Sequence, residues 1–162
     1  MTRSEYNRAV QEYSGRLYRF VYKCLRNSDD TRDVLQDSFA KLWQNRDKVE
    51  WPKAKSWLFT VAYNGLLNLI RTRNRVELVD EFSSYEPYME ADLRIELKEI
   101  VDNALELLTP IQRSVILLRD LEGYDYAEIG QILNLNESQV KVYLFRARQK
   151  IKNHLKDLTV LS

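Results

Sequence analysis

The sequence contains few of the residues that interrupt regular structure. Among its 162 residues there are only four glycines and three prolines. Proteins built from strands and tight turns use both residues often, so their scarcity argues against that architecture and favours long helices. We therefore predict an all-α fold.

Residues that carry covalent or metal chemistry are also scarce. The single cysteine, Cys24, excludes an internal disulfide, and its neighbours Phe20, Val21 and Leu25 predict a reduced thiol in the core. The only histidine, His154, lies in a basic stretch near the C-terminus. The sequence offers no glycine-rich phosphate loop, metal-ligand cluster or nucleophile–base pair. We expect no enzymatic activity, no cofactor and no metal.

Long apolar runs are absent as well. No run approaches the length needed to cross a membrane, and the N-terminal stretch MTRSEYNRAVQEYSGR lacks the apolar segment of a signal peptide. With 44% hydrophobic and 30% charged residues, the composition is that of a soluble chain that folds. We expect a cytoplasmic protein.

The charge is unevenly distributed along the chain, although the net charge is only +1. Residues 1–75 contain 15 basic and 8 acidic side chains, residues 76–100 contain 2 and 8, and residues 101–162 contain 8 of each. Six of those last bases lie within residues 138–156, which contain no acid. Two basic surfaces separated by an acidic segment favour a polyanion as partner.

Apolar residues recur at helical spacing on both sides of this acidic segment, which contains Pro87 and shows no sustained period. The segment is therefore predicted to be a linker between two small helical bundles. The predicted helices cover residues 5–26, 31–44, 57–75, 93–108, 110–121, 126–134 and 137–155.

Helix signals are strongest in the C-terminal half. Thr109 and Gln112 form a predicted capping box with proline at the first helical position, and Gly123 is a stop signal. Asp125 and Glu128 form a second predicted box. These signals place a helix boundary on each side of residues 121–125.

A helix-turn-helix is predicted to follow. Two helices that cross steeply through a tight turn need a small residue at the crossing and a turn residue that tolerates the left-handed conformation. Gly130 and Asn134 meet these needs, although glycine in place of the commoner alanine is expected to cost some helix stability. The apolar contacts across the crossing are expected from Ile129, Leu133, Leu135 and Val140.

The second helix of this motif has two different faces. Its predicted core seam contains Val140, Leu144, Ala147, Ile151 and Leu155, and the opposite side carries Lys141, Val142, Phe145, Arg146, Gln149 and Lys152. A merely solvated face seldom carries Phe and Val. Because a DNA-reading face combines bases for phosphates with apolar groups for thymine methyls, we predict duplex DNA as the partner. A protein contact for Phe145 is the alternative.

These patterns resemble a known family. The stretch ALELLTPIQRSVILLRDLEGYDYAEIGQILNLNESQVKVYLFRARQKIKNHL resembles region 4 of sigma-70-family transcription initiation factors. The stretches DDTRDVLQDSFAKLW and SWLFTVAYNGLLNLIR resemble region 2. With only these regions, the chain resembles an extracytoplasmic-function (ECF, group 4) sigma factor. The resemblance implies region 2 over residues 1–76, a linker over 77–93 and region 4 over 94–162.

The resemblance also implies partners for region 2. A sigma factor of this kind binds core RNA polymerase, recognises the −35 promoter element and melts the −10 element. The polar face of the helix over residues 31–44 would dock on the polymerase through Asp33, Gln36, Asp37 and Trp43. The −10 element would be held by Lys48, Trp51, Lys53, Lys55, Asn64, Asn68 and Arg71. Trp57, which begins an apolar helix, is expected in the core.

In region 4, the resemblance implies that the −35 element is contacted by Arg113, Ser138, Gln139, Lys141, Val142, Phe145, Arg146, Arg148 and Lys150. Arg148 and Lys150 are expected to contact phosphates. For Arg113, pairing with a nearby acid is an equal alternative. The chain departs from the residues usual in the family at Ser138, Gln139 and Val142. These departures affect which DNA sequence is read, not whether DNA is bound.

Two other functions stay open from the sequence. A helix-turn-helix regulator would bind DNA without polymerase, and an all-helical interaction module would bind no DNA. The resemblance further implies an anti-sigma factor that covers both regions of the free protein. The acidic linker could instead shield the basic surfaces.

Overall fold

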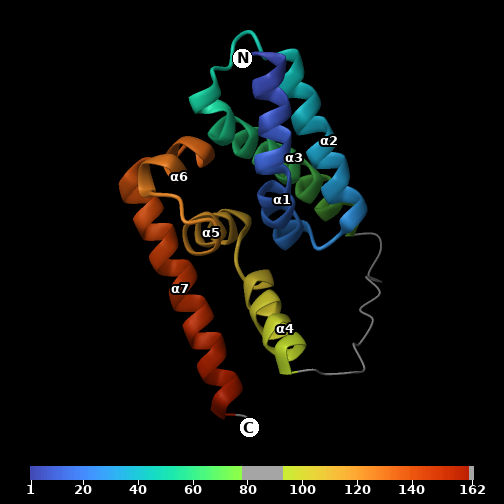
Figure 1. Cartoon of the computed structure of the whole chain (residues 1–162). Coiled ribbons are helices and arrows are strands. Elements are labelled where there is room, and N and C mark those ends of the chain that lie inside the picture. The colour runs from blue at the N-terminus through green and yellow to red at the C-terminus, as the bar shows by residue number, and fades with distance from the viewer. Residues whose placement is uncertain (78–92, 161–162) are drawn as a thin grey trace.

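The computed structural model of the chain describes residues 1–77 and 93–160, and every regular element among them is helical (Figure 1). The all-α prediction is therefore confirmed. Apart from Glu77 and Leu93, the predicted linker lies outside the described residues, and so does the hypothesis that it shields the basic surfaces.

The N-terminal half is a bundle of three long helices. It consists of α1 (Arg3–Leu25), α2 (Ser28–Gln44), the 3₁₀ turn η1 (Trp51–Lys53) and α3 (Ala54–Glu77). Helix α2 begins three residues earlier than predicted because the Asn27 side chain accepts a hydrogen bond from the Asp30 N–H and so caps the helix. Large side chains that are fully buried fill this bundle, among them Leu17, Phe20, Leu42, Leu58, Phe59 and Leu66.

The C-terminal half contains shorter helices and one long one. It consists of α4 (Leu93–Glu106), α5 (Pro110–Ile116), the π-helical turn η2 (Leu117–Leu121), α6 (Tyr126–Leu133) and α7 (Glu137–Val160). The capping box of Thr109 and Gln112 is confirmed, and Gly123 ends the turn with a φ of 74°. The box predicted for Asp125 and Glu128 forms only in part.

Asp125 caps α6 by accepting from the Glu128 N–H at 2.8 Å. The Glu128 carboxylate, however, lies 3.4 Å from Lys55 Nζ in the other half of the chain. The second capping box is therefore wrong in one of its two hydrogen bonds. The Glu128 carboxylate pairs with Lys55 instead of accepting from the Asp125 N–H.

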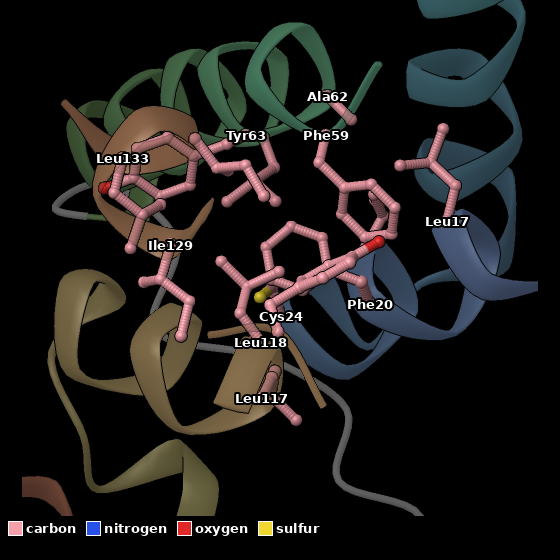
Figure 2. Packing of buried hydrophobic residues seen from close by; sticks show 14 of the residues in the cluster. Leu17, Phe20, Cys24, Phe59, Ala62, Tyr63, Leu117, Leu118, Ile129 and Leu133 are labelled. Atoms are coloured by element: carbon pink, nitrogen blue, oxygen red, sulfur yellow. The ribbon is translucent and has the colours of Figure 1, made fainter. Parts of the chain in front are cut away.

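The two halves are not separate bodies, because their buried side chains form one continuous core. The ring of Phe59 in α3 lies 5.2 Å from that of Tyr124 and 5.6 Å from that of Phe20 in α1. Figure 2 shows Leu117, Leu118, Ile129 and Leu133 of the C-terminal half in the same cluster as Phe20, Cys24, Phe59 and Tyr63. The prediction of two bundles omitted this contact, since periodicity identifies an apolar face but not what covers it.

Cys24 is a buried, free thiol within this shared core, as predicted. Burial raises the pKa of the Cys24 thiol to about 12, while the charge of Arg113 and the nearby Ser114 hydroxyl act in the opposite direction. Both of these residues come from α5, so the C-terminal half covers the cysteine of α1.

The helix-turn-helix crossing depends on the absence of a side chain at Gly130. The carbonyl oxygen of Gly130 accepts the Leu135 N–H at 2.9 Å, and Asn134 adopts the left-handed conformation with a φ of 57°. A Cβ atom at Gly130 would lie 2.5 Å from the Leu135 carbonyl oxygen. Glycine is thus required by this turn, which corrects the expectation that it only costs helix stability where alanine would serve.

We predict that Gly130→Ala lowers the free energy of unfolding by about 1–3 kcal/mol, because the turn must move to admit the methyl group. Gly15→Ala is the matched control, since Gly15 lies in α1 with open space around it. The control should stabilise the protein by about 0.5–1 kcal/mol through helix propensity. Urea unfolding of both variants measures the difference, and equal effects would contradict the role of the crossing.

Candidate nucleic-acid and polymerase interfaces

The outward face of α7 carries the side chains that were predicted to read DNA. Val142 is 44% exposed and Phe145 69%, the largest exposure among the described large apolar residues. Lys141 and Arg146 are exposed beside them. The helical phasing is therefore confirmed. The face presents cations and apolar groups together, and these side chains do not pack in the core.

The inward seam of α7 is shorter than predicted. Val140, Leu144 and Ala147 are buried, whereas Leu155 is 39% exposed. The prediction that Leu155 completes the seam is wrong. Ile151 is only partly buried, so the fully buried part of the seam ends at Ala147.

A hollow of about 210 Å³ lies beside this outward face, and Tyr126 at the start of α6 forms part of its lining. The Lys141 ammonium lies 5.6 Å from the centre of the Tyr126 ring and the Arg119 guanidinium 4.7 Å from it. Such cation–π contacts hold long side chains in place. Sequence reasoning missed Tyr126, although a large aromatic residue directly after a helix cap is a usable signal.

The start of α7 uses one predicted DNA contact as a cap. The Gln139 N–H donates to the Asn136 side chain, and the Gln139 side chain accepts from the Asn136 N–H. The predicted cap at Asn136 is thus confirmed, and the amide oxygen of Gln139 is engaged in it. Ser138 is exposed next to the same turn.

Two further cations of α7 have partners on α5 and η2. The Arg148 guanidinium lies 2.6 Å from an Asp120 carboxylate oxygen, and Lys150 Nζ donates to the Gln112 side chain at 3.2 Å. Both cations are exposed. An exposed ion pair contributes little stability, so a phosphate could replace Asp120 at small cost.

Arg113 was predicted to contact DNA, but its side chain is bound to the protein's own backbone. Its guanidinium donates to the carbonyl oxygens of Leu105 and Glu106 at the end of α4, to that of Leu108 just after it, and to that of Cys24 in α1. All three of its side-chain nitrogens are thus engaged by the backbone. Neither the DNA contact nor the alternative of an acidic partner describes Arg113 in this form of the protein; unpaired carbonyls at a helix end attract it instead.

The predicted polymerase-binding face of α2 is exposed. Asp33, Gln36 and Asp37 all face outward, and Asp37 pairs with Lys41 at 2.9 Å on the same helix. Trp43, at the end of the helix, is 37% exposed and lies under the Arg46 guanidinium at 4.0 Å from its ring centre. This face presents an acidic row that ends in an aromatic residue.

A groove of about 420 Å³ runs between α2 and α3. Asp33 and Asp37 lie along its α2 side, and Asn64 and Asn68 lie along its α3 side. Two residues predicted to bind polymerase and two predicted to bind the −10 element therefore share one groove. The sequence could not show this, because their proximity depends on how the two helices pack.

Most of the other predicted −10 residues lie near the N-terminal end of α3. Lys48 and Lys53 are exposed around η1, and Trp51 stacks on Tyr13 with ring centres 6.1 Å apart under the Arg8 guanidinium. Trp57 is partly buried against the core, as predicted.

Lys55 and Asn64 face opposite sides of α3. Nine residues at 100° each amount to two and a half turns, or about half a turn net. Lys55 accordingly faces Glu128 of α6, whereas Asn64 faces the α2 groove. Arg71 is exposed and directly precedes Thr72, which lines the groove. The structure thus divides the predicted −10 set between two sides of one helix.

No helix in the described part of the chain is long and apolar enough to cross a membrane. The two halves correspond to matches with two family models. The model described as "Sigma-70 region 2" matches residues 9–76, and that described as "Sigma-70, region 4" matches residues 98–151.

Individual proteins show the same relationship. The chain is 31% identical to the ECF RNA polymerase sigma-E factor of Salmonella typhimurium over 81% of this chain and 76% of that protein. It is 28% identical to the ECF RNA polymerase sigma factor SigM of Bacillus subtilis over 88% and 90%. The fold is similar to that of the sigma factor RpoE, solved in complex with the anti-sigma factor NepR from Bartonella quintana, with a TM-score of 0.75, 24% identity and coverage of 93% and 96%. The chain therefore belongs to the sigma-70 family, among its ECF members, and is an alternative sigma factor that directs transcription initiation.

Proposed function

We propose that the chain binds core RNA polymerase through α2, reads the −35 element with α7 and opens the −10 element along α3. The observation that carries this proposal is the outward face of α7, where Phe145 is 69% exposed between cations. Leaving so large an apolar group in water has no benefit for folding, whereas a thymine methyl in the major groove would cover it.

Within this face we assign different roles to different cations. Arg146 has the reach and the planar donors to pair with a guanine edge. Arg148 and Lys150 lie beside protein partners that a phosphate can replace, so they position the helix on the backbone. Lys141 is held over the Tyr126 ring and so is a fixed cation at the N-terminal end of the same face.

The −10 element would be held on α3 by the amides of Asn64 and Asn68. An amide offers both donors and an acceptor, which suits the edges of unpaired bases. The nearby carboxylates of Asp33 and Asp37 would repel DNA unless polymerase covers them. We infer that binding of core polymerase to α2 prepares the groove for the DNA strand.

We further propose that the protein acts in the cytoplasm, without catalysing a reaction itself, and that an anti-sigma factor controls it. The support for the anti-sigma factor is the similarity to the RpoE fold, which was solved with such a partner. Co-purification of the tagged chain from its own cells, followed by identification of a bound protein, tests this proposal.

Co-elution with purified core RNA polymerase tests the proposed function as a whole. The chain should elute with core and support transcription from promoter DNA selected out of a random library. A chain that binds DNA but not core would be a helix-turn-helix regulator. A chain that binds neither DNA nor core would be an all-helical interaction module.

Arg146→Ala should weaken promoter binding by about 1–3 kcal/mol and relax the preference for one base, because the variant loses the contacts that read a base edge. Arg148→Ala should instead weaken binding to all sequences and reduce its salt dependence. Titration of holoenzyme on wild-type and base-substituted promoters at several salt concentrations separates the two effects. Lys156→Ala, later on the same helix, serves as control. If Arg146→Ala changed only the salt dependence, the base-reading role would be wrong.

Asn64→Ala should slow promoter opening with little change in binding to core, because the amide faces the DNA side of the groove. Asp33→Asn should instead weaken binding to core and leave promoter opening unchanged once core is saturated with the variant, since its carboxylate lies on the α2 side of the same groove. Permanganate reactivity of thymines measures opening, and co-elution measures core binding. Normal opening with Asn64→Ala would exclude this role.

A further inference from the structure

Two aromatic rings and a guanidinium group form a stack where η1 meets α1. The ring of Trp51 lies 6.1 Å from that of Tyr13, with 26° between the ring planes. The Arg8 guanidinium lies over the same indole, 4.7 Å from the ring centre. Both rings are only partly buried and pack at the edge of the core. We call Arg8, Tyr13 and Trp51 the α1–η1 stack.

The position of the Trp51 ring is fixed by α1. Tyr6 and Tyr13 are seven residues apart and so lie on the same side of that helix. The Tyr6 ring packs edge-on against Trp43 at 4.9 Å, and Tyr13 stacks on Trp51. The two tyrosines thus hold a tryptophan at each end of the connection between α2 and η1. Val49, within that connection, is 5% exposed. Trp51 is therefore oriented before any ligand binds.

The stack offers what proteins use to hold unpaired bases, an aromatic face with a cation beside it. The Arg8 side chain is 61% exposed, and Arg8 Nε lies 2.7 Å from a carboxylate oxygen of Glu12, which is 43% exposed. An exposed pair of this kind contributes little stability, so a phosphate can replace Glu12 at small cost. Residues 45–55 add four basic and two acidic side chains, which leaves the surroundings of Trp51 positive.

The stack is separate from the groove that contains Asn64. Asn64 follows Ala54, the first residue of α3, by ten positions, or about 15 Å along the helix axis. Its groove is lined by residues of α2 and α3, whereas the stack is built from α1 and η1. One base cannot be stacked on Trp51 and hydrogen-bonded to Asn64 at the same time. A strand that contacts both sites does so through different nucleotides.

We propose that the α1–η1 stack is a second binding site for the melted −10 strand, in which one unpaired base stacks on the Trp51 indole. The base takes the place of the Arg8 guanidinium over the ring, and Arg8 exchanges Glu12 for a neighbouring phosphate. Tyr13 is a positioning residue that holds the indole. Because stacking tolerates any base, this site retains the strand while the amides on α3 read it. The proposal rests on the proposed function for the identity of the strand.

A scan with abasic nucleotides locates the stacked base. Holoenzyme is titrated with single-stranded oligonucleotides that carry the −10 strand of the promoter selected from random DNA, each lacking one base. For the wild type, loss of the stacked base should weaken binding about tenfold. For Trp51→Ala, the same loss should have no further effect, because the platform is gone. Tyr13→Leu should remove most of the effect, whereas Tyr13→Phe should retain it, since a ring remains.

Tyr18→Leu is the matched control, because it removes from α1 a ring that stacks on Tyr22 at 5.9 Å, away from the tryptophans. This control should keep the full effect of the abasic nucleotide. Asn64→Ala should abolish the effect at a different nucleotide. The stack is refuted if Trp51→Ala abolishes it at no position, or if Tyr13→Leu and Tyr18→Leu behave alike.

Arg8 gives a test that leaves the packed rings in place. Arg8→Gln should lower the slope of log K against log salt concentration by about 0.7, the value for one phosphate of a single strand. Lys98→Gln, which removes an exposed cation of α4, should leave the slope unchanged. An unchanged slope with Arg8→Gln would overturn the phosphate contact.

These measurements separate the stack from the proposed function. A wild-type chain that forms no holoenzyme, or a holoenzyme that does not bind the strand, would refute the proposed function. Normal binding and opening by the wild type, with no effect of Trp51→Ala or Tyr13→Leu on the abasic scan, would refute the stack alone.

Discussion

Two carboxylates without access to water determine how the halves of this protein are arranged. Glu122 and Asp102 are both nearly fully buried, and each is paired with two cations from α1 and its C-cap residue Arg26. Such groups destabilise any arrangement in which they are buried alone. They therefore select one way of docking the halves, whereas the apolar contacts around Phe59 and Tyr124 supply the attraction.

The same constraint explains why Arg113 and Lys55 differ from the other predicted site residues. Residues on α2 and on the outward face of α7 lie away from the junction and are exposed as a DNA- or protein-binding surface requires. Arg113 and Lys55 lie at the junction, where backbone oxygens and Glu128 engage them. A residue can thus match a family's binding position and still have an internal partner while the chain is free.

Local features of the fold could be predicted from the sequence because each has a nearby cause. The caps at Thr109 and Asn136, the left-handed turn at Asn134 and the two faces of α7 all depend on residues within one or two helical turns. The docking of the halves depends on pairs such as Arg16 and Glu122, which are 106 positions apart. No periodicity links such positions. The groove that joins Asp33 to Asn64 was unpredictable for the same reason.

The π-helical turn η2 has a consequence for how such a factor can be tuned. The Glu122 N–H donates to the Leu117 carbonyl oxygen, five residues earlier, where an α-helix would use a spacing of four. This one-residue expansion sets the direction in which Glu122 leaves the helix. Loss or gain of a single residue in η2 would rotate the acid by about 100°. A change in the length of η2 between related factors would therefore alter how the two halves dock, while the helices on either side keep their sequences.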